Sequence, residues 1–259
     1  MKKLMIVASA ALCATVGFGL ESANVVGYNN TAARANLNWY APCFRSIGVN
    51  TTDINDIQLN DGTSAGEMPT VGWGDSMQIV GPLGSASGMY FYYDASMNPA
   101  GVEGGNFWGD ENMSPVDISF DEGDGLAIDN ANALTFNIVG SGDVSTNDVV
   151  FAARSNLNWS GNPFPMAIDI NSIQLDDGTP TGEMPTVGWG DSMQIVGPLG
   201  SASEMYFYYD ASMNPAGAEG GNFWGDENMS PISLKLSPGA GFAIDNANGL
   251  TFNIVIKCK

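Results

Sequence analysis

The sequence contains no histidine and little positive charge. It has 8 lysines and arginines against 28 aspartates and glutamates, and its formal net charge is −20. Without histidine, the chain cannot build a Ser-His-Asp triad, a Cys-His dyad or a histidine-ligated zinc, copper or iron site. Nucleic acids and anionic membrane surfaces bind basic footprints, so this charge balance argues against both as partners.

Long apolar runs are also missing. Residues 4–16 form an apolar run that is too short to cross a bilayer, and no later stretch approaches the roughly 18 apolar residues of a transmembrane helix. This run follows Lys2-Lys3 and precedes small residues, a pattern typical of a secretory signal peptide over residues 1–19. Cleavage there leaves six basic residues against 28 acidic ones, a net charge of −22. We therefore expect an acidic protein that is secreted or held at the cell surface.

The chain contains an internal duplication. Residues 57–115 and 173–231 align at a constant offset of 116, and only five of the 59 positions differ. The similarity continues more weakly on both sides of this segment. We therefore expect two domains, over residues 20–140 and 141–259, with a turn at Gly140-Ser141-Gly142-Asp143 as the seam between them.

Alternating apolar and polar residues predict β-strands. Residues 116–121 are apolar at every second position, and their counterparts in the second copy keep this pattern while the polar positions change freely. A period of two with one apolar side is typical of a half-buried strand. Similar patterns occur at 76–79 and 134–138, and residues 89–93 form a short aromatic run with high β-propensity. Glycine, proline and asparagine turns lie between these segments. We predict an all-β chain of two tandem β-sandwich or small barrel-like domains, without a convincing helix.

Several short motifs stand out along the chain. Residues 22–28 read S-A-N-V-V-G-Y, and the second copy runs from Asn156-Leu157 to Asn162-Pro163-Phe164. It then carries a P-G-x-G-F turn at 238–242 and an L-T-F strand at 250–252. In these motifs the chain resembles a group of exported bacterial proteins built from β-rich repeats. The resemblance implies export and a β-repeat, and it implies no activity.

Two cysteines, Cys43 and Cys258, remain once the signal peptide is removed. Neither has a counterpart in the other copy. Exported proteins form disulfides, so we expect these two to pair. The bond would close a loop of about 215 residues, which corresponds to roughly 5 kcal/mol in the chain-entropy description. Two free thiols are the alternative.

Carboxylates are the next candidates for chemistry. Two acids across one cleft can hydrolyse glycosides, but nothing in the sequence selects a pair, so a secreted hydrolase is the least favoured function. Oxygen ligands without histidine suit calcium, and acid clusters occur at 109–112, 121–124 and 176–178. None has the EF-hand pattern, and the cluster at 121–124 is missing from the second copy. Structural Ca²⁺ stays open, and no other cofactor is expected.

Aromatic side chains offer a binding role. Trp108 and Trp224 lie in twin Gly-Gly-Asn-Phe-Trp-Gly-Asp loops that we expect to be exposed, where the indoles would stack against sugars. The alternative is that the aromatics pack the core. The favoured function is a non-catalytic exported protein with a structural role in an extracellular or surface layer, partnered by glycans or by its own copies. A pair of carbohydrate-binding modules is the alternative.

Overall fold

The computed structural model describes residues 26–63, 73–80, 89–179, 194–196, 205–246 and 248–258. The expected signal peptide, residues 1–19, lies outside these ranges. Within them the extended regular structure consists of β-strands joined by turns and loops, and the helical segments are 3₁₀ turns of three residues. The all-β prediction is therefore confirmed. No helix in the described ranges has the length and apolarity to cross a membrane.

The first unit, residues 26–143, consists of antiparallel sheets. Their strand orders are β1-β10-β4, β3-β8 and β2-β9-β5-β6-β7. The strands are β1 (Val26–Ala32), β2 (Asn36–Tyr40), β3 (Thr51–Asp53), β4 (Ile57–Asn60), β5 (Trp73–Val80), β6 (Met89–Tyr93), β7 (Phe107–Gly109), β8 (Ser119–Asp121), β9 (Leu126–Asn130) and β10 (Asn137–Asp143). The 3₁₀ turns are η1 (Ile54–Asp56), η3 (Ala95–Met97) and η4 (Val102–Gly104).

The second unit, residues 149–258, repeats this arrangement. Its sheets have the orders β11-β20-β14, β13-β18 and β12-β19-β15-β16-β17. The strands are β11 (Val149–Ala152), β12 (Asn156–Gly161), β13 (Ile168–Asp169), β14 (Ile173–Asp176), β15 (Gln194–Val196), β16 (Met205–Tyr209), β17 (Phe223–Gly225), β18 (Lys235–Leu236), β19 (Gly241–Asn246) and β20 (Asn253–Ile256). The 3₁₀ turns are η5 (Ile170–Ser172), η7 (Ala211–Met213) and η8 (Ala218–Gly220). The sequence duplication is thus a duplication of structure.

Each unit has its own hydrophobic core. The first core takes buried side chains from all three sheets of its unit, including Ile57, Phe120 and Ile128. The second core takes the equivalent side chains Ile173, Leu236 and Ile244. The predicted alternation holds around Phe120, which is buried between the exposed Ser119 and Asp121. The two cores share no residue.

The turn predicted at residues 140–143 is wrong. Strand β10 continues through Asp143, which pairs with Val26 at the start of β1. The glycines there make room for neighbouring residues. A Cβ on Gly140 would lie 3.0 Å from the Tyr40 hydroxyl, and one on Gly142 would overlap the backbone carbonyl of Arg45. The change from one unit to the next falls at residues 144–148, here called the linker.

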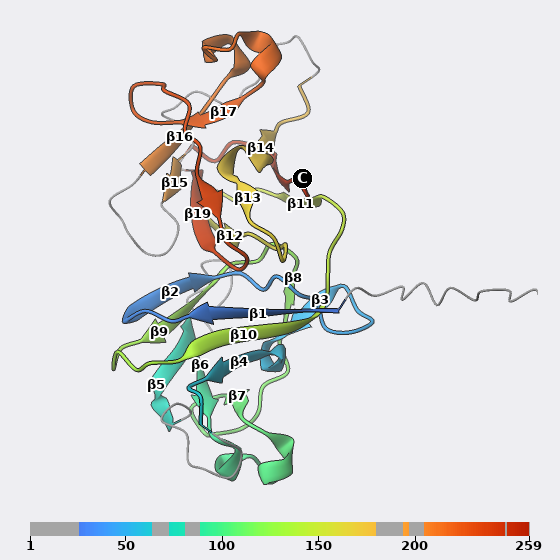
Figure 1. Cartoon of the computed structure of the whole chain (residues 1–259), viewed down its shortest axis with the longest axis vertical. Helices are drawn as coiled ribbons and strands as arrows, with labels where there is room; N and C mark the ends of the chain where they lie inside the picture. Colours follow the sequence, from blue (N-terminus) through green and yellow to red (C-terminus); the bar gives the residue numbers. More distant parts are fainter. Residues whose placement is uncertain are drawn as a thin grey trace, which may run out of the picture.

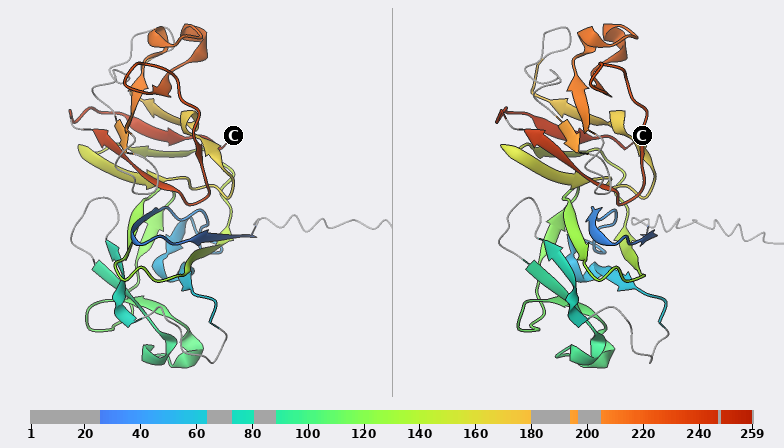
Figure 2. Two further views of the ribbon diagram at one scale, coloured as in Figure 1. Left: turned by 60° about the vertical axis from the view of Figure 1, so that its left-hand side comes forward. Right: turned by 90° about the vertical axis from the view of Figure 1, so that its left-hand side faces the viewer.

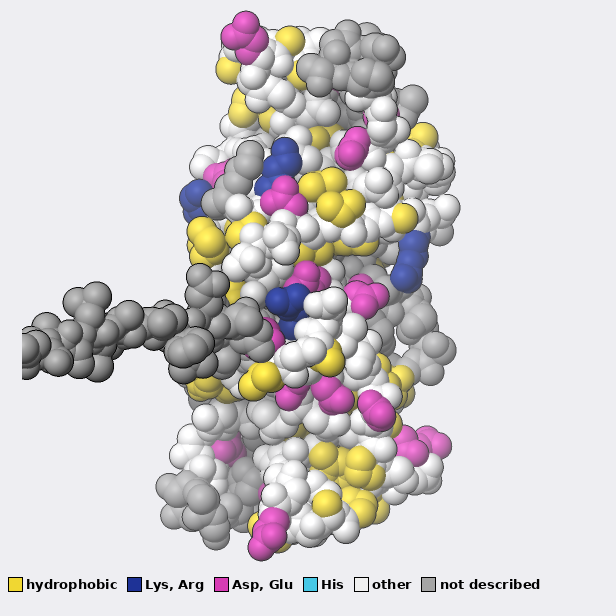
Figure 3. Space-filling model, turned by 90° about the vertical axis from the view of Figure 1, so that its right-hand side faces the viewer, with side chains coloured by type: hydrophobic (Ala, Val, Ile, Leu, Met, Phe, Trp, Pro, Cys, Tyr) yellow, Lys and Arg dark blue, Asp and Glu magenta, His cyan; other side chains and the backbone are white. Residues whose placement is uncertain are grey.

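The two units lie end to end along the long axis of the molecule (Figures 1 and 2). The edge strands β2 and β12 lie where the units meet, and the linker runs along one side from β10 to β11. On the face drawn in Figure 3, acidic side chains are scattered from end to end, whereas the few basic ones lie over the middle of the molecule.

Candidate functional site

The structure places Trp108 and Trp224 in the cores, not on the surface. Both side chains are 0% exposed, so the exposed stacking platform predicted for them is wrong. Each indole N–H donates to the backbone carbonyl of the residue that follows a 3₁₀ turn. The distance is 2.7 Å from Trp108 to Ile57 and 2.8 Å from Trp224 to Ile173. The tryptophans lie in β7 and β17, whose residues are all buried. Two glycines precede each of these strands and a third ends it, so the glycines shape the loop without exposing the indole.

A buried tyrosine lies beside each of these tryptophans. The Tyr92 ring is 4.9 Å from Trp108, and the Tyr208 ring is 5.0 Å from Trp224. Each hydroxyl accepts from a strand N–H and donates to a glutamine, Gln58 in the first unit and Gln174 in the second. Burial raises the pKa of both phenols to about 12, so they stay protonated and hold the core strands.

Both cysteines are free thiols, so the disulfide predicted between Cys43 and Cys258 is not formed in the structure. Cys43 follows β2 and is 1% exposed. Burial raises the pKa of its thiol to about 12. Cys258 belongs to the other unit, where it packs against the second core and its N–H donates to Asp148. The two thiols therefore belong to different units.

Acidic side chains form turns in both units. Asp110 accepts from the backbone N–H groups of Asn112 and Ser114, and Asp226 makes the equivalent pair of bonds. These bonds hold the pKa of both carboxyls below the usual value. Asp94 and Asp210 cap η3 and η7 in the same way.

The acid clusters that we considered as calcium ligands do not converge on one point. Asp124 accepts from the Asp121 N–H, whereas Glu122 pairs with Arg45. Asp176 accepts from the N–H of Gly178 within its own turn. Across the part of the chain that the structure describes, no three acidic or cysteine side chains gather around one point where a metal ion would bind.

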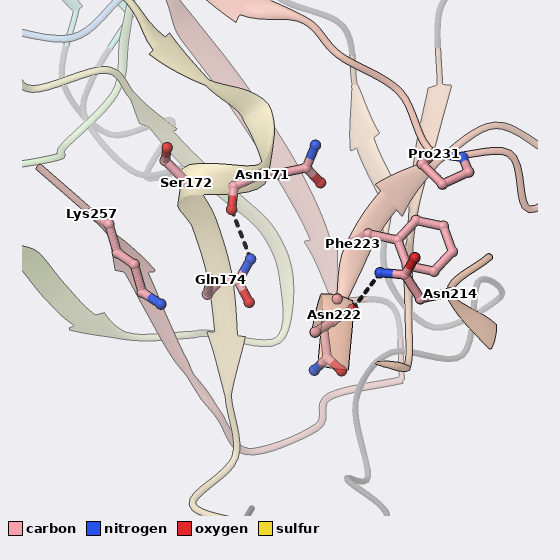
Figure 4. A pocket seen from close by; sticks show the side chains of 10 residues that line it. Asn171, Ser172, Gln174, Asn214, Asn222, Phe223, Pro231 and Lys257 are labelled. Carbon is pink, nitrogen blue, oxygen red and sulfur yellow. Dashed lines mark hydrogen bonds between the residues drawn. The ribbon is translucent and has the colours of Figure 1, made fainter. Parts of the chain in front are cut away.

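One cavity of about 480 Å³ opens in the second unit. One side of the cavity carries Gln174 in β14 and Lys257, which directly follows the adjacent strand β20. Figure 4 shows Asn214, Asn222 and Phe223 on the other side. The lining is rich in amides, and the remaining residues are Asn171, Ser172, Gly220, Gly221 and Pro231. None of the described residues that line it is acidic.

Hydrogen bonds fix the amides of this cavity. The Asn171 side chain accepts from the backbone N–H of Trp224 at 2.9 Å and donates to the backbone carbonyl of Ile232 at 2.8 Å. Asn214 donates to the Gly221 carbonyl, and Asn222 accepts from the Ala211 N–H, both at 2.8 Å. The walls are therefore held in place by backbone contacts.

The equivalent surface of the first unit has the same amide framework with a different charge. Asn55 and Asn98 repeat the bonds of Asn171 and Asn214. Two lining positions differ, because Asp56 replaces Ser172 and Ser141 replaces Lys257. The cation is thus specific to the second unit, and the described residues place no carboxylate within ion-pair distance of Lys257.

Sequence reasoning missed the amides and Lys257. The amides recur in both copies, but so does nearly every residue of the repeated segment, which hides them. The charge difference between Lys257 and Ser141 was the available signal. No family model, curated protein or solved structure matches the chain.

Proposed function

We propose that the protein is an exported, non-catalytic β-repeat protein with a structural role in an extracellular or cell-surface layer. The observation that carries this proposal is how the reactive side chains are used. In both units the acids cap turns, as Asp110 and Asp226 do, and the aromatics fill cores, as Trp108 and Trp224 do. Side chains of the types that could perform chemistry therefore stabilise the folds of the two units.

The proposed architecture is a pair of β-sandwiches. In the first unit, the three-stranded sheet supplies Leu59 and Ile138 to the core, and the five-stranded sheet supplies Tyr92 and Ile128. Two sheets that contribute opposed apolar faces to one core are typical of a sandwich. Such units suit an extracellular layer, because each one is stabilised by its own hydrophobic core.

Export is tested on the chain in its native cell. We expect an antibody against the protein to detect it in the extracellular or surface fraction, and mass spectrometry to find an N-terminus near Leu20. Full-length protein that stays in the cytoplasm would contradict the proposal.

The lack of catalysis is tested on the same material. A panel of polysaccharides is incubated with the purified protein, and new reducing ends are measured. We expect no turnover above the buffer rate. Turnover that disappears when one acid is replaced by its amide would support a hydrolase instead.

Binding of an acidic saccharide is a second candidate, and Lys257 is the observation that favours it. Sugar hydroxyls pair with amides, which line the cavity, and a carboxylate or sulfate on the sugar would pair with the lysine ammonium. The first unit lacks this cation, so we expect one site in each chain.

A glycan array with the mature protein tests this candidate. We expect acidic saccharides to bind and Lys257→Ala to reduce binding at least tenfold, because one charge-assisted hydrogen bond contributes about 1.5–3 kcal/mol. Ser141→Ala, at the equivalent position of the first unit, is the matched control and leaves binding unchanged. Equal binding by both variants, or none by the native protein, would refute the candidate.

A further inference from the structure

The two units meet through residues that are each other's equivalents. Trp39 in β2 and Trp159 in β12 correspond in the duplication, and their rings stack with centroids 3.8 Å apart and planes 8° apart. Two residues further along, Gly161 lies against its equivalent, Ala41, so closely that a Cβ on the glycine would lie 2.4 Å from the alanine Cβ. Contacts between equivalent residues occur on a two-fold axis.

Away from this axis, two β-bridges form a reciprocal pair. Tyr40 forms a β-bridge with Ala240, and Asp124, the equivalent of Ala240, forms one with Ser160, the equivalent of Tyr40. This reciprocity defines an isologous interface, in which both partners use the same surface.

Glycines make the approach of the two backbones close enough for these bridges. A Cβ on Gly125 would lie 2.5 Å from the Ser160 nitrogen, and one on Gly241 would lie 2.7 Å from the Tyr40 nitrogen. Backbone bonds join the units there, from the Ala41 N–H to the Gly239 carbonyl at 3.0 Å and from the Gly125 N–H to the Trp159 carbonyl at 3.2 Å.

A clamp, made of Arg45 and Glu122, holds the linker against the first unit. Arg45 pairs with Glu122 at 3.1 Å and donates to the Val144 carbonyl at 3.5 Å. Glu122 also accepts from the Ser145 hydroxyl at 3.3 Å. The clamp exists once, because proline replaces Glu122 in the second copy and Arg45 adjoins an insertion unique to the first.

From this geometry we propose that the interface also forms between two chains, so that the first unit of one chain pairs with the second unit of another. The partner is thus a second copy of this protein, joined by exchange of halves. Exchange needs no new surface, because all its contacts are those already made within one chain. Only the five-residue linker and its clamp must open. The proposal depends on the fold alone and would stand if the structural role failed.

The interface favours unlike units. Tyr40 lies over Gly239, where a Cβ would approach the ring to 2.7 Å, and it bridges to the small Ala240. Two first units paired with each other would place Tyr40 opposite Asp124, a carboxylate. The second unit has the small Ser160 opposite Asp124, and its hydroxyl donates to the Gly123 carbonyl at 2.6 Å. First and second units are therefore complementary.

Complementation between two full-length variants tests the proposal. Trp39→Asp damages the interface from the first unit, and Trp159→Asp damages it from the second. A mixed dimer keeps one native interface, between the intact first unit of one chain and the intact second unit of the other. We expect each variant alone to have the mass of one chain by light scattering, and the mixture to give the mass of two chains.

Controls separate exchange from unfolding and from general association. Leu37→Asp and Leu157→Asp change exposed side chains of the same two strands, and their mixture should stay at one chain. If circular dichroism shows that either tryptophan variant is unfolded, Gly125→Val and Gly241→Val replace the pair. Larger, open assemblies in the mixture also support exchange between chains. Folded variants whose mixture keeps the mass of one chain overturn the proposal.

Discussion

Replacing the buried tryptophans by phenylalanine tests the most important difference between the sequence prediction and the structure. Trp224→Phe removes the N–H that donates to the Ile173 carbonyl at 2.8 Å in a fully buried site. Loss of that bond costs about 1–3 kcal/mol, because the carbonyl stays buried without this donor. The smaller ring also leaves a void, which adds about 1 kcal/mol. We expect the free energy of unfolding of the second unit to fall by about 2–4 kcal/mol.

The first unit supplies the matched variant. Trp108→Phe removes the equivalent bond to the Ile57 carbonyl, so its cost should be of the same size and fall on the first unit. Because the two cores share no residue, the two costs should add to within about 0.5 kcal/mol in the double variant. Trp39→Phe is the control, because Trp39 stacks at the interface and belongs to neither core.

Urea unfolding followed by circular dichroism measures these costs, with acrylamide quenching of the native fluorescence as a check on burial. A cost within about 0.5 kcal/mol of zero for both variants would match ordinary surface substitutions and refute the burial of these side chains. It would also restore them as candidates for sugar stacking.

Three further predictions concern other buried or capped groups. The Tyr40 hydroxyl is buried without a hydrogen-bond partner among the described residues, so Tyr40→Phe should leave stability unchanged or raise it by about 1 kcal/mol. In the same thermal or urea assay, Tyr92→Phe should cost about 1–3 kcal/mol, because it removes a hydroxyl with two hydrogen bonds. The opposite order of stabilities would contradict these assignments. In the mature protein, a thiol reagent at pH 8 should label Cys258 readily and Cys43 only on unfolding, because burial raises the pKa of Cys43 to about 12. Two equivalents of label in the native state, or only one in the unfolded state, would be inconsistent with the structure. Because the pKa of Asp110 and Asp226 is lowered, their contribution to stability is present above the ordinary carboxyl pKa and is lost as the pH falls through the lowered value. The double variant Asp110→Asn with Asp226→Asn should therefore lose less thermal stability than the native protein as the pH falls. An unchanged loss of stability at acid pH would count against the capping role.

The sequence supported the fold better than the sites. Alternation predicted Phe120 and Ile138 as buried strand residues, because burial of one face imposes a period of two. The duplication predicted two units, and both have the same sheet order. Local composition failed at residues 140–143, where glycines that suggested a turn instead give Phe44 and Arg45 room beside a continuous strand.

The candidate sites depended on tertiary contacts that no local pattern specifies. Exposure of Trp108 was inferred from its glycine-rich neighbours, but burial is decided by the core that β7 joins. The interface between the units left one signal in the sequence. The turns at 122–126 and 238–242 differ at every position except their glycines, and two of these, Gly125 and Gly241, allow the backbones of the units to touch.

The central claim is that the two units are joined symmetrically through Trp39 and Trp159. Far-ultraviolet circular dichroism tests it directly, because two indoles stacked at 3.8 Å couple electronically and give a paired positive and negative band. We expect this couplet in the native protein and its equal loss in Trp39→Phe and Trp159→Phe, whereas Trp108→Phe should retain it. A native spectrum without the couplet, or one that survives both substitutions, would contradict the account.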